Sequence, residues 1–264
     1  MSALVRATRV EVLKLRRTLA LWASVLVPLL VLGMTGANIL ARDTSGPLGN
    51  PQAGPWNSLT INFVFFLWCL VALPLLVALE TALLAGVEHR ENSWKHLFAL
   101  PVPRWSLYTA KLVVASLLLA VSSLVLAIGV GLEGQALDAV HPVLGLAPPV
   151  PWGPIFSAAA SFSGAALCQL AIQTWVATRW RSFPLALGLG IAGTVAGLVL
   201  GISPRSAFWA SIFPWSLPFI AVPRPEPLAL ALSSTPTSAL AVGIVGGLLA
   251  GVLGCWDVCR RDNV

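Results

Sequence analysis

Long apolar blocks, rather than alternating apolar and polar positions, dominate the chain. Each block is long enough to cross the ~30 Å hydrocarbon core of a bilayer as a helix, which takes ~20 residues. A transmembrane β-barrel would instead need alternating strands of ~10 residues, and the sequence has no such pattern. The blocks therefore predict an all-α polytopic membrane protein with six transmembrane helices, at residues 19–40, 60–86, 109–132, 154–178, 184–203 and 238–258.

Residues 2–18, ahead of the first block, predict an amphipathic helix that lies along the membrane surface. On a helical wheel, one sector holds the basic residues Arg6, Arg9, Arg16 and Arg17. The opposite side is largely apolar, and it holds Leu4, Val5, Ala7, Val12 and Leu15. A basic amphipathic helix of this kind binds at a bilayer interface. A plain basic anchor before the first span is the alternative. The block that follows is longer than the 7–15-residue core of a signal peptide, which favours a retained helix.

The composition agrees with a membrane protein. Of the 264 residues, 57% are hydrophobic and only 10% are charged, whereas soluble domains carry about 25% charged residues. Six spans and short loops use almost the whole length, so we expect residues 1–264 to form one transmembrane domain. The net charge of +6 comes from basic residues beside the apolar blocks, and we therefore expect no nucleic-acid partner.

The basic residues also predict how the chain is oriented. Thirteen of the sixteen Lys and Arg residues fall on one side of the six-span arrangement, and the other side holds only Arg42, Arg205 and Arg224. Because Lys and Arg are enriched in cytoplasmic connections, the richer side is predicted to be cytoplasmic. This places both ends of the chain in the cytoplasm.

The connection between the second and third predicted spans is the longest on that side. It begins with charged residues at Glu88, Arg90, Glu91 and Lys95, interleaved with Trp94, and continues through an apolar patch to Leu100. Aromatic residues together with Arg are typical of protein interfaces. A short helix resting on lipid headgroups, with its tryptophans in the aromatic belt, is the alternative.

The outer segment 204–237 is apolar but interrupted by prolines, including Pro214 and Pro218. It is too broken for a regular span and too apolar for a free loop. A re-entrant or interfacial segment fits this pattern, since irregular backbone at membrane depth must be buried in protein or line a cavity.

Three kinds of residue inside the predicted spans could serve packing or transport. Glu80 is an ionisable group in the second span, where such groups are costly and therefore candidates for function. Gln169 and Gln173 lie one turn apart in the fourth span, and they could line a translocation path or bond neighbouring helices. Glycines at four-residue spacing predict close helix packing. They are Gly193, Gly197, Gly201, Gly243, Gly247 and Gly251.

Signatures of enzymes and of nucleotide binding are missing from the sequence. It contains no His-Glu-x-x-His, no Gly-x-Ser-x-Gly and no phosphate-binding Gly-x-x-x-x-Gly-Lys-Ser/Thr motif. Cys255 and Cys259 share a helix face, but no further ligands lie nearby to complete a metal site. We therefore expect no catalytic residue, metal or cofactor in this chain, and any transport driven by ATP would need a partner.

Three short motifs resemble the export permeases of ATP-binding cassette (ABC) transporters of the bacitracin-resistance and lantibiotic-immunity type. The first is Glu11-Val-Leu-Lys14-Leu-Arg16-Arg17 before the first span. The second is Leu100-Pro-Val-Pro-Arg104 followed by Ala110-Lys111 at the start of the third span. The third is Arg260-Arg261-Asp262 after the last span. Together these motifs and their spacing cover nearly the whole chain.

The resemblance implies an export permease subunit in a bacterial cytoplasmic membrane. It does not extend to the substrate, because the outer segment 204–237 matches the family only in general character. A path with no charged lining would suit a lipophilic or amphipathic, peptide-antibiotic-like substrate. The resemblance implies two copies of a separate cytoplasmic ATPase, which holds ATP and magnesium, and a second permease subunit, identical or sibling. It also implies that residues 88–100 dock on the ATPase as a coupling helix. The expected contacts are Glu88, Arg90, Glu91, Trp94 and Lys95.

Two other functions remain open from the sequence. A non-transporting membrane scaffold or assembly subunit would have the same spans without an ATPase partner. A polytopic membrane enzyme would need polar residues clustered inside the spans, where the sequence offers Glu80, Gln169 and Gln173.

Overall fold

A computed structural model describes residues 3–15, 18–42, 47–48, 54–90, 103–146, 149–180, 182–202, 204–222 and 236–260. Only the backbone is described at 61–62, 87–90 and 204. Within these residues every regular element is helical, and six helical stretches are long and apolar enough to cross a membrane. The predicted all-α, six-span membrane protein is therefore confirmed.

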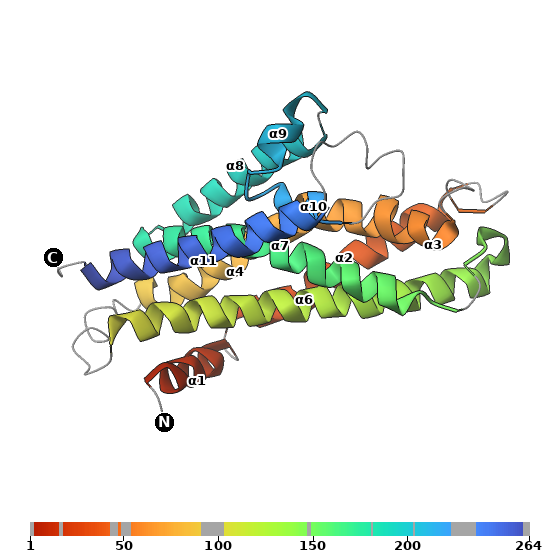
Figure 1. The fold of residues 1–264 in the computed structure, drawn as a ribbon. Coiled ribbons are helices and arrows are strands. Elements are labelled where there is room, and N and C mark those ends of the chain that lie inside the picture. The colour runs from red at the N-terminus through yellow and green to blue at the C-terminus, as the bar shows by residue number, and fades with distance from the viewer. Residues whose placement is uncertain are drawn as a thin grey trace.

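The six spans form an elongated bundle (Figure 1). The first is α2 (Leu19–Leu40), and the second runs from Pro55 to Gly86 and contains α3 (Pro55–Asn57), η1 (Ser58–Phe65), η2 (Trp68–Ala72) and most of α4 (Leu73–Arg90). The remaining four are α6 (Arg104–Val140), α7 (Trp152–Arg179), α8 (Phe183–Ile202) and α11 (Pro236–Arg260).

The second span is irregular in its first half. Both η1 and η2 are π-helical, with wider turns than an α-helix, and they join the regular α4. Wide turns of this kind insert extra residues and turn the side chains that follow. In this half of the span, the Trp68 side chain is fully buried. The Phe65 ring contacts the Phe162 ring of α7 edge-on, with 5.4 Å between the ring centroids. The irregular half therefore fits the core closely.

Helix α7 is the central element of the bundle. It packs most extensively against α11 and also contacts α6, α4 and the short α10 (Leu217–Ile220). Fifteen of its 28 residues are buried, whereas only five of the 20 in α8 and five of the 25 in α11 are. Helices α8 and α11 therefore present most of their surface to the surroundings.

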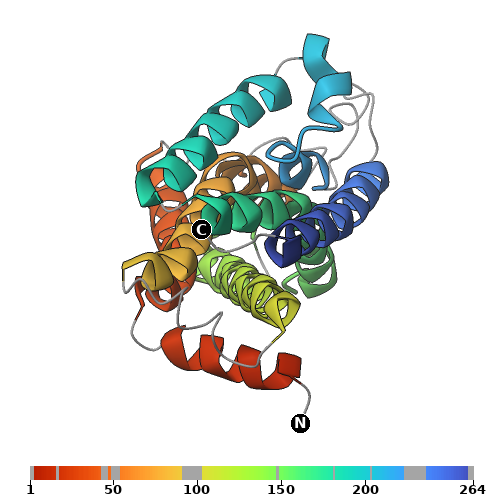
Figure 2. The ribbon, with the colours of Figure 1, turned by 90° about the vertical axis from the view of Figure 1, so that its left-hand side faces the viewer.

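The N-terminal helix α1 (Ala3–Leu15) lies across the bundle, beside the end where α11 finishes (Figures 1 and 2). Its buried stripe is Ala7, Glu11 and Leu15, one turn apart. Val5 and Val12, which the helical wheel assigns to the apolar face, are both 43% exposed. Ala7 and Leu15 of the predicted apolar face are therefore buried against the bundle with the charged Glu11 between them, whereas Val5 and Val12 lie on the exposed surface of α1.

Helix α6 is longer than the third predicted span. It runs from Arg104 to Val140, beyond the predicted range 109–132. His141 separates it from the 3₁₀ turn η3 (Pro142–Leu144). Residues 133–140 contain good helix formers and no proline, so the helix continues until Pro142 stops it. The first part of the predicted outer connection is therefore helical.

The segment after α8 folds back toward the bundle. It forms η4 (Pro204–Ser206), α9 (Ala207–Ala210) and α10, and α10 contacts both α7 and α11. The buried Ser216 hydroxyl donates to the carbonyl of Ala210 at 2.6 Å, which ties α9 to α10. Residues 223–235 of the predicted 204–237 segment lie outside the described residues.

Candidate functional site

A buried ionic junction joins three helices at one end of the bundle. The ammonium of Lys111 in α6 lies 3.2 Å from the Glu11 carboxylate of α1 and donates to the Leu84 carbonyl of α4, also at 3.2 Å. Lys14 donates to the other Glu11 oxygen at 2.7 Å. Glu11 and Lys111 are 3% and 2% exposed. The junction therefore fixes α1 to both helices that flank the connection between the second and third spans.

The junction holds Glu11 in its charged form. Burial of the carboxyl would raise its pKa, but the charges of Lys111 and Lys14 outweigh this, so the pKa of Glu11 lies below its ordinary value. When one partner of such a buried pair is removed, the other charge is left without compensation, which costs about 3–5 kcal/mol. A strong link between α1 and α6 therefore depends on both residues.

The junction also lies close to the predicted docking segment. Leu84 is six residues before the end of α4 and Lys111 is seven residues after the start of α6, which places each about 10 Å from the helix end. Of the predicted contacts, Glu88 and Arg90 lie in the last turn of α4, where only the backbone is described. Glu91, Trp94 and Lys95 lie outside the described residues, as does the rest of 91–100.

Gln169 and Gln173 both bond to neighbouring helices. The side-chain amide of Gln169 donates to the Pro74 carbonyl of α4 at 2.9 Å, and that of Gln173 donates to the Ala186 carbonyl of α8 at 2.6 Å. Both residues are fully buried. The two glutamines therefore link α7 to α4 and to α8.

Glu80 of α4 differs from the two glutamines. It is 1% exposed, and its Oε1 has no hydrogen-bond partner among the described residues. Leu84, whose carbonyl belongs to the ionic junction, follows it by one turn of α4. Among the described residues, no hydrogen bond at Oε1 therefore explains why the Glu80 carboxyl group is buried.

The spaced glycines meet two different neighbours. A Cβ on Gly243 of α11 would come within 2.4 Å of the Ala165 Cα, and one on Gly247 within 2.9 Å of the Leu167 carbonyl carbon, so α11 lies directly against the α7 backbone. In α8, a Cβ on Gly193 would instead contact the ring of Trp215, and one on Gly197 would contact its backbone. Gly201 and Gly251 have more room, with nearest atoms at 3.3 and 3.4 Å.

The sequence analysis did not predict the junction, although it contains the three charged residues Glu11, Lys14 and Lys111. Glu11, Lys14 and Lys111 were assigned to family motifs or to the positive side of the membrane, but Glu11 and Lys111 are 100 positions apart. One signal was present: Lys111 lies inside the third apolar block, where an unpaired ammonium would be costly. A search for its counter-charge would have led to the nearby acidic residues, including Glu11.

The chain matches one family model over most of its length. The model describes an ABC-2 family transporter protein, and it matches residues 7–197, from α1 to α8. The matched range contains Glu11, Lys111, Glu80 and the two α7 glutamines. No curated protein and no solved structure matches the chain. Because the family match covers well over half of the 264 residues, the chain belongs to the ABC-2 family of transporter proteins, and it is the membrane-spanning permease subunit of an ABC transporter.

Proposed function

We propose that the chain is an export permease of the bacitracin-resistance and lantibiotic-immunity type. In this proposal it moves a lipophilic or amphipathic, peptide-antibiotic-like substrate outward across a bacterial cytoplasmic membrane. Two copies of a cytoplasmic ATPase drive it, and a second permease subunit, identical or sibling, completes the transporter. The observation that carries the proposal is the ionic junction of Glu11, Lys111 and Leu84 beside the docking segment 88–100, within a chain of this family.

The junction supports a route for the driving motion. A force applied to residues 88–100 acts first on the end of α4 and the start of α6, because these helices flank the segment. Since Lys111 binds both Leu84 and Glu11, α1 must move with them or break a buried ion pair. We therefore propose that α1, α4 and α6 move as one unit when the ATPase closes on ATP.

The uncharged faces of α2 and α8 support the pairing interface and the class of substrate. Neither helix contains a charged residue, and both expose large apolar side chains, among them Leu26 and Leu30 of α2 and Val195 and Val199 of α8. We propose that the two permease subunits meet along these helices and α4. A path between them without charged side chains suits a lipophilic or amphipathic molecule.

The distribution of basic residues supports the orientation. Both α1 and the end of α11 lie toward the same end of the bundle (Figure 1), where the basic residues Arg104, Arg179 and Arg260 also mark helix ends. By the positive-inside rule we propose that this end, with both termini, faces the cytoplasm.

The proposal is tested by purifying the detergent-solubilised chain from its native membrane and identifying what accompanies it. We expect a nucleotide-binding ATPase with the wild type and its loss from the Glu91→Ala/Trp94→Ala variant. The control is Arg205→Ala/Trp209→Ala, which removes one charged side chain, of opposite sign, and one tryptophan at the opposite end of the bundle and should retain the ATPase.

Each of the other outcomes has a defined meaning. Equal recovery with both variants would leave the transporter intact but contradict docking through Glu91 and Trp94. Absence of any ATPase under conditions that preserve complexes would favour a scaffold subunit. ATP-driven transport by the purified chain alone would overturn the proposal, because the chain has no phosphate-binding motif.

A further inference from the structure

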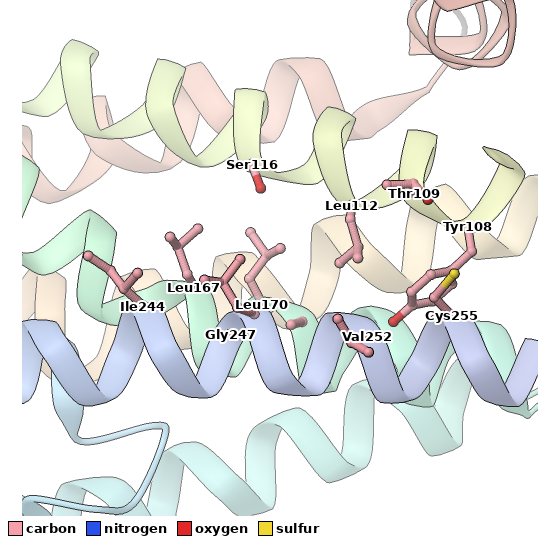
Figure 3. Close-up of a pocket in the computed structure, with 13 residues that line it drawn as sticks. Tyr108, Thr109, Leu112, Ser116, Leu167, Leu170, Ile244, Gly247, Val252 and Cys255 are labelled. Atoms are coloured by element: carbon pink, nitrogen blue, oxygen red, sulfur yellow. The ribbon is translucent and has the colours of Figure 1, made fainter. Parts of the chain in front are cut away.

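An apolar groove lies between α6, α7 and α11, on the side of α6 away from α1 (Figures 2 and 3). It has an open volume of about 400 Å³, within the range of ligand pockets. Among the described residues, no charged side chain lines it, and the polar side chains in its lining are those of Tyr108, Thr109, Ser116 and Cys255. The groove therefore offers a site for a hydrocarbon chain rather than for a polar molecule.

Glycine keeps this groove open on the α11 side. Gly247 and Gly251 are two of its lining residues, one turn apart. A Cβ at Gly251 would meet nothing within 4 Å except the Leu112 Cδ1, at 3.4 Å. The missing side chain at Gly251 therefore contributes to the open space, unlike Gly243, whose missing side chain is taken up by contact with the α7 backbone.

The length of the groove corresponds to one leaflet of a bilayer. Its α11 wall extends from Ile244 to Cys255, which at 1.5 Å per residue is about 17 Å. Half of a ~30 Å hydrocarbon core is ~15 Å. Cys255 lies five residues before the end of α11, so the groove begins near the membrane surface and runs inward. An acyl chain of the adjacent leaflet would match it in length and direction.

The surface end of the groove is polar, and the described charged residues at the helix ends near it, Arg104, Arg179, Arg260 and Asp257, carry a net positive charge. Tyr108 and Cys255 lie together there, and Ile244 lies at the inner end (Figure 3). Arg104 begins α6 and Arg260 ends α11, about one turn beyond these two residues. The Arg260 guanidinium stacks on the Trp256 ring at 4.1 Å, an arrangement typical of membrane interfaces, where Trp and Arg meet headgroups. These charges favour an anionic headgroup.

We propose that the groove binds one acyl chain of an anionic phospholipid from the leaflet at this end, with the phosphate near Arg104 and Arg260. The groove is too small to enclose a helix of a second copy, because a helix ~10 Å across and ~17 Å long occupies more than ~1,000 Å³. The bound acyl chain fills the space left between α6 and α11 along half of the membrane, and the lipid tethers the start of α6 to the bilayer surface. The site is distinct from the ionic junction and does not depend on the transported substrate.

The test uses the full chain reconstituted in phosphatidylcholine vesicles that contain a phosphatidylglycerol analogue with a photoreactive group in its acyl chain. After illumination, peptide mapping should find adducts on the groove-facing residues of α6 and α11, such as Ser116 and Val252. Unlabelled phosphatidylglycerol should compete for these adducts better than phosphatidylcholine does. Equal competition would overturn the headgroup assignment.

Two matched variants show whether the adducts come from the groove. Gly251→Phe fills it, and adducts there should fall about tenfold, the change for losing the burial of about two methylene groups. Leu253→Phe adds the same ring to the outer face of α11, where Leu253 is 54% exposed, and should leave the adducts unchanged. Equal adducts in both variants would mean ordinary bulk lipid contact and would overturn the proposal.

A second filling variant guards against misfolding. Ser116→Phe fills the groove from the α6 wall and should give the same loss of adducts as Gly251→Phe. Folding of each variant is checked by its elution volume and thermal midpoint. Cross-links between two copies of the chain through the groove residues, in place of lipid adducts, would show a protein interface there and would also overturn the proposal.

Discussion

At one end of the bundle, the ion pair on the α1 side is buried, whereas the ion pair on the α11 side is exposed. On the α1 side, Glu11 and Lys111 pair at 3.2 Å with both side chains almost fully buried. On the α11 side, Arg179 and Asp257 pair at 3.5 Å with side chains 44% and 24% exposed, and Asp257 also accepts a bond from the Trp175 indole at 3.0 Å. An apolar groove lies next to the exposed pair, whereas the buried pair is covered by α1.

The difference in burial indicates which of the two sides, that of α1 or that of α11, can change its contacts. A buried ion pair cannot be replaced by water at low cost, so α1 is fixed to α4 and α6. An exposed pair exchanges readily with water, salt or headgroups and contributes little to stability. The α1 side therefore suits the transmission of force, and the α11 side suits contact with lipid.

The largest expected effect comes from breaking the buried pair. Glu11→Gln keeps the shape of the side chain but removes the negative charge that compensates the buried Lys111 ammonium, which should lower the free energy of unfolding by about 3–5 kcal/mol. Lys111→Met should cost less, because Lys14 still pairs with Glu11 at 2.7 Å. Chemical unfolding of the detergent-solubilised chain measures both.

The double variant Glu11→Gln/Lys111→Met is the control for this pair. Because neither buried charge is then left unpaired, we expect it to be more stable than Glu11→Gln alone. If the two single effects instead add in the double variant, the residues are not energetically coupled and the junction does not fix α1.

The next effect tests how closely α11 is packed away from the groove. Gly243→Ala places a Cβ 2.4 Å from the Ala165 Cα, and because backbone has to move, we expect a loss of about 1–3 kcal/mol in stability. Gly251→Ala is the matched control on the same helix. Its Cβ has room at 3.4 Å from Leu112, and the helix propensity of Ala should make it neutral or stabilising by up to about 1 kcal/mol. Equal losses at both positions would contradict the groove.

Acid should weaken the attachment of α1 to the bundle. The pKa of Glu11 is lowered in the folded protein, so its contribution to stability is complete above the ordinary value of 4.5 and is lost as the pH falls through the folded value. We expect α1 to separate from α6 below that range. Spin labels at the exposed positions Leu13 and Leu117 would measure the distance in a cysteine-free background.

The Glu11→Gln variant serves as the control for this pH dependence. With no carboxyl at the junction, its label distance should not respond to acid in the same range. An equal acid response in this variant would assign the effect to another group and leave the junction without a role in it.

The sequence predicted the fold well because six apolar blocks leave few alternatives in a membrane. It also predicted that glycines mark close packing, as Gly243 shows against α7. It could not predict which neighbour each glycine meets, since Gly193 faces the ring of Trp215 from a segment that is itself irregular. Likewise, helical periodicity gave α1 an apolar stripe, but only the tertiary partner Lys111 explains why Glu11 is buried in it.

The candidate site was less predictable than the fold for a related reason. Lys111 lies close to the end of its predicted span, where a basic residue usually marks the cytoplasmic side of the membrane. Its buried position depends on α1 folding back across the bundle, a contact between residues 100 positions apart that no local pattern contains. The groove is also a property of three helices together, and Gly251 has the same sequence spacing as the close-packed Gly247.

The smallest expected effect sharpens the comparison on the α11 side. Arg179→Met removes a guanidinium that is 44% exposed, and an exposed pair of this kind contributes about 0–1 kcal/mol. The remaining Asp257 can still accept the Trp175 indole and be solvated, so we expect little change in unfolding and a small response to salt. The loss of stability from Glu11→Gln, measured alongside, should be insensitive to salt because the Glu11–Lys111 pair of the wild type is buried. A loss from Arg179→Met as large as that from Glu11→Gln would show that both sides of the bundle end depend on charge pairing, and the distinction between a fixed and an adaptable side would no longer hold.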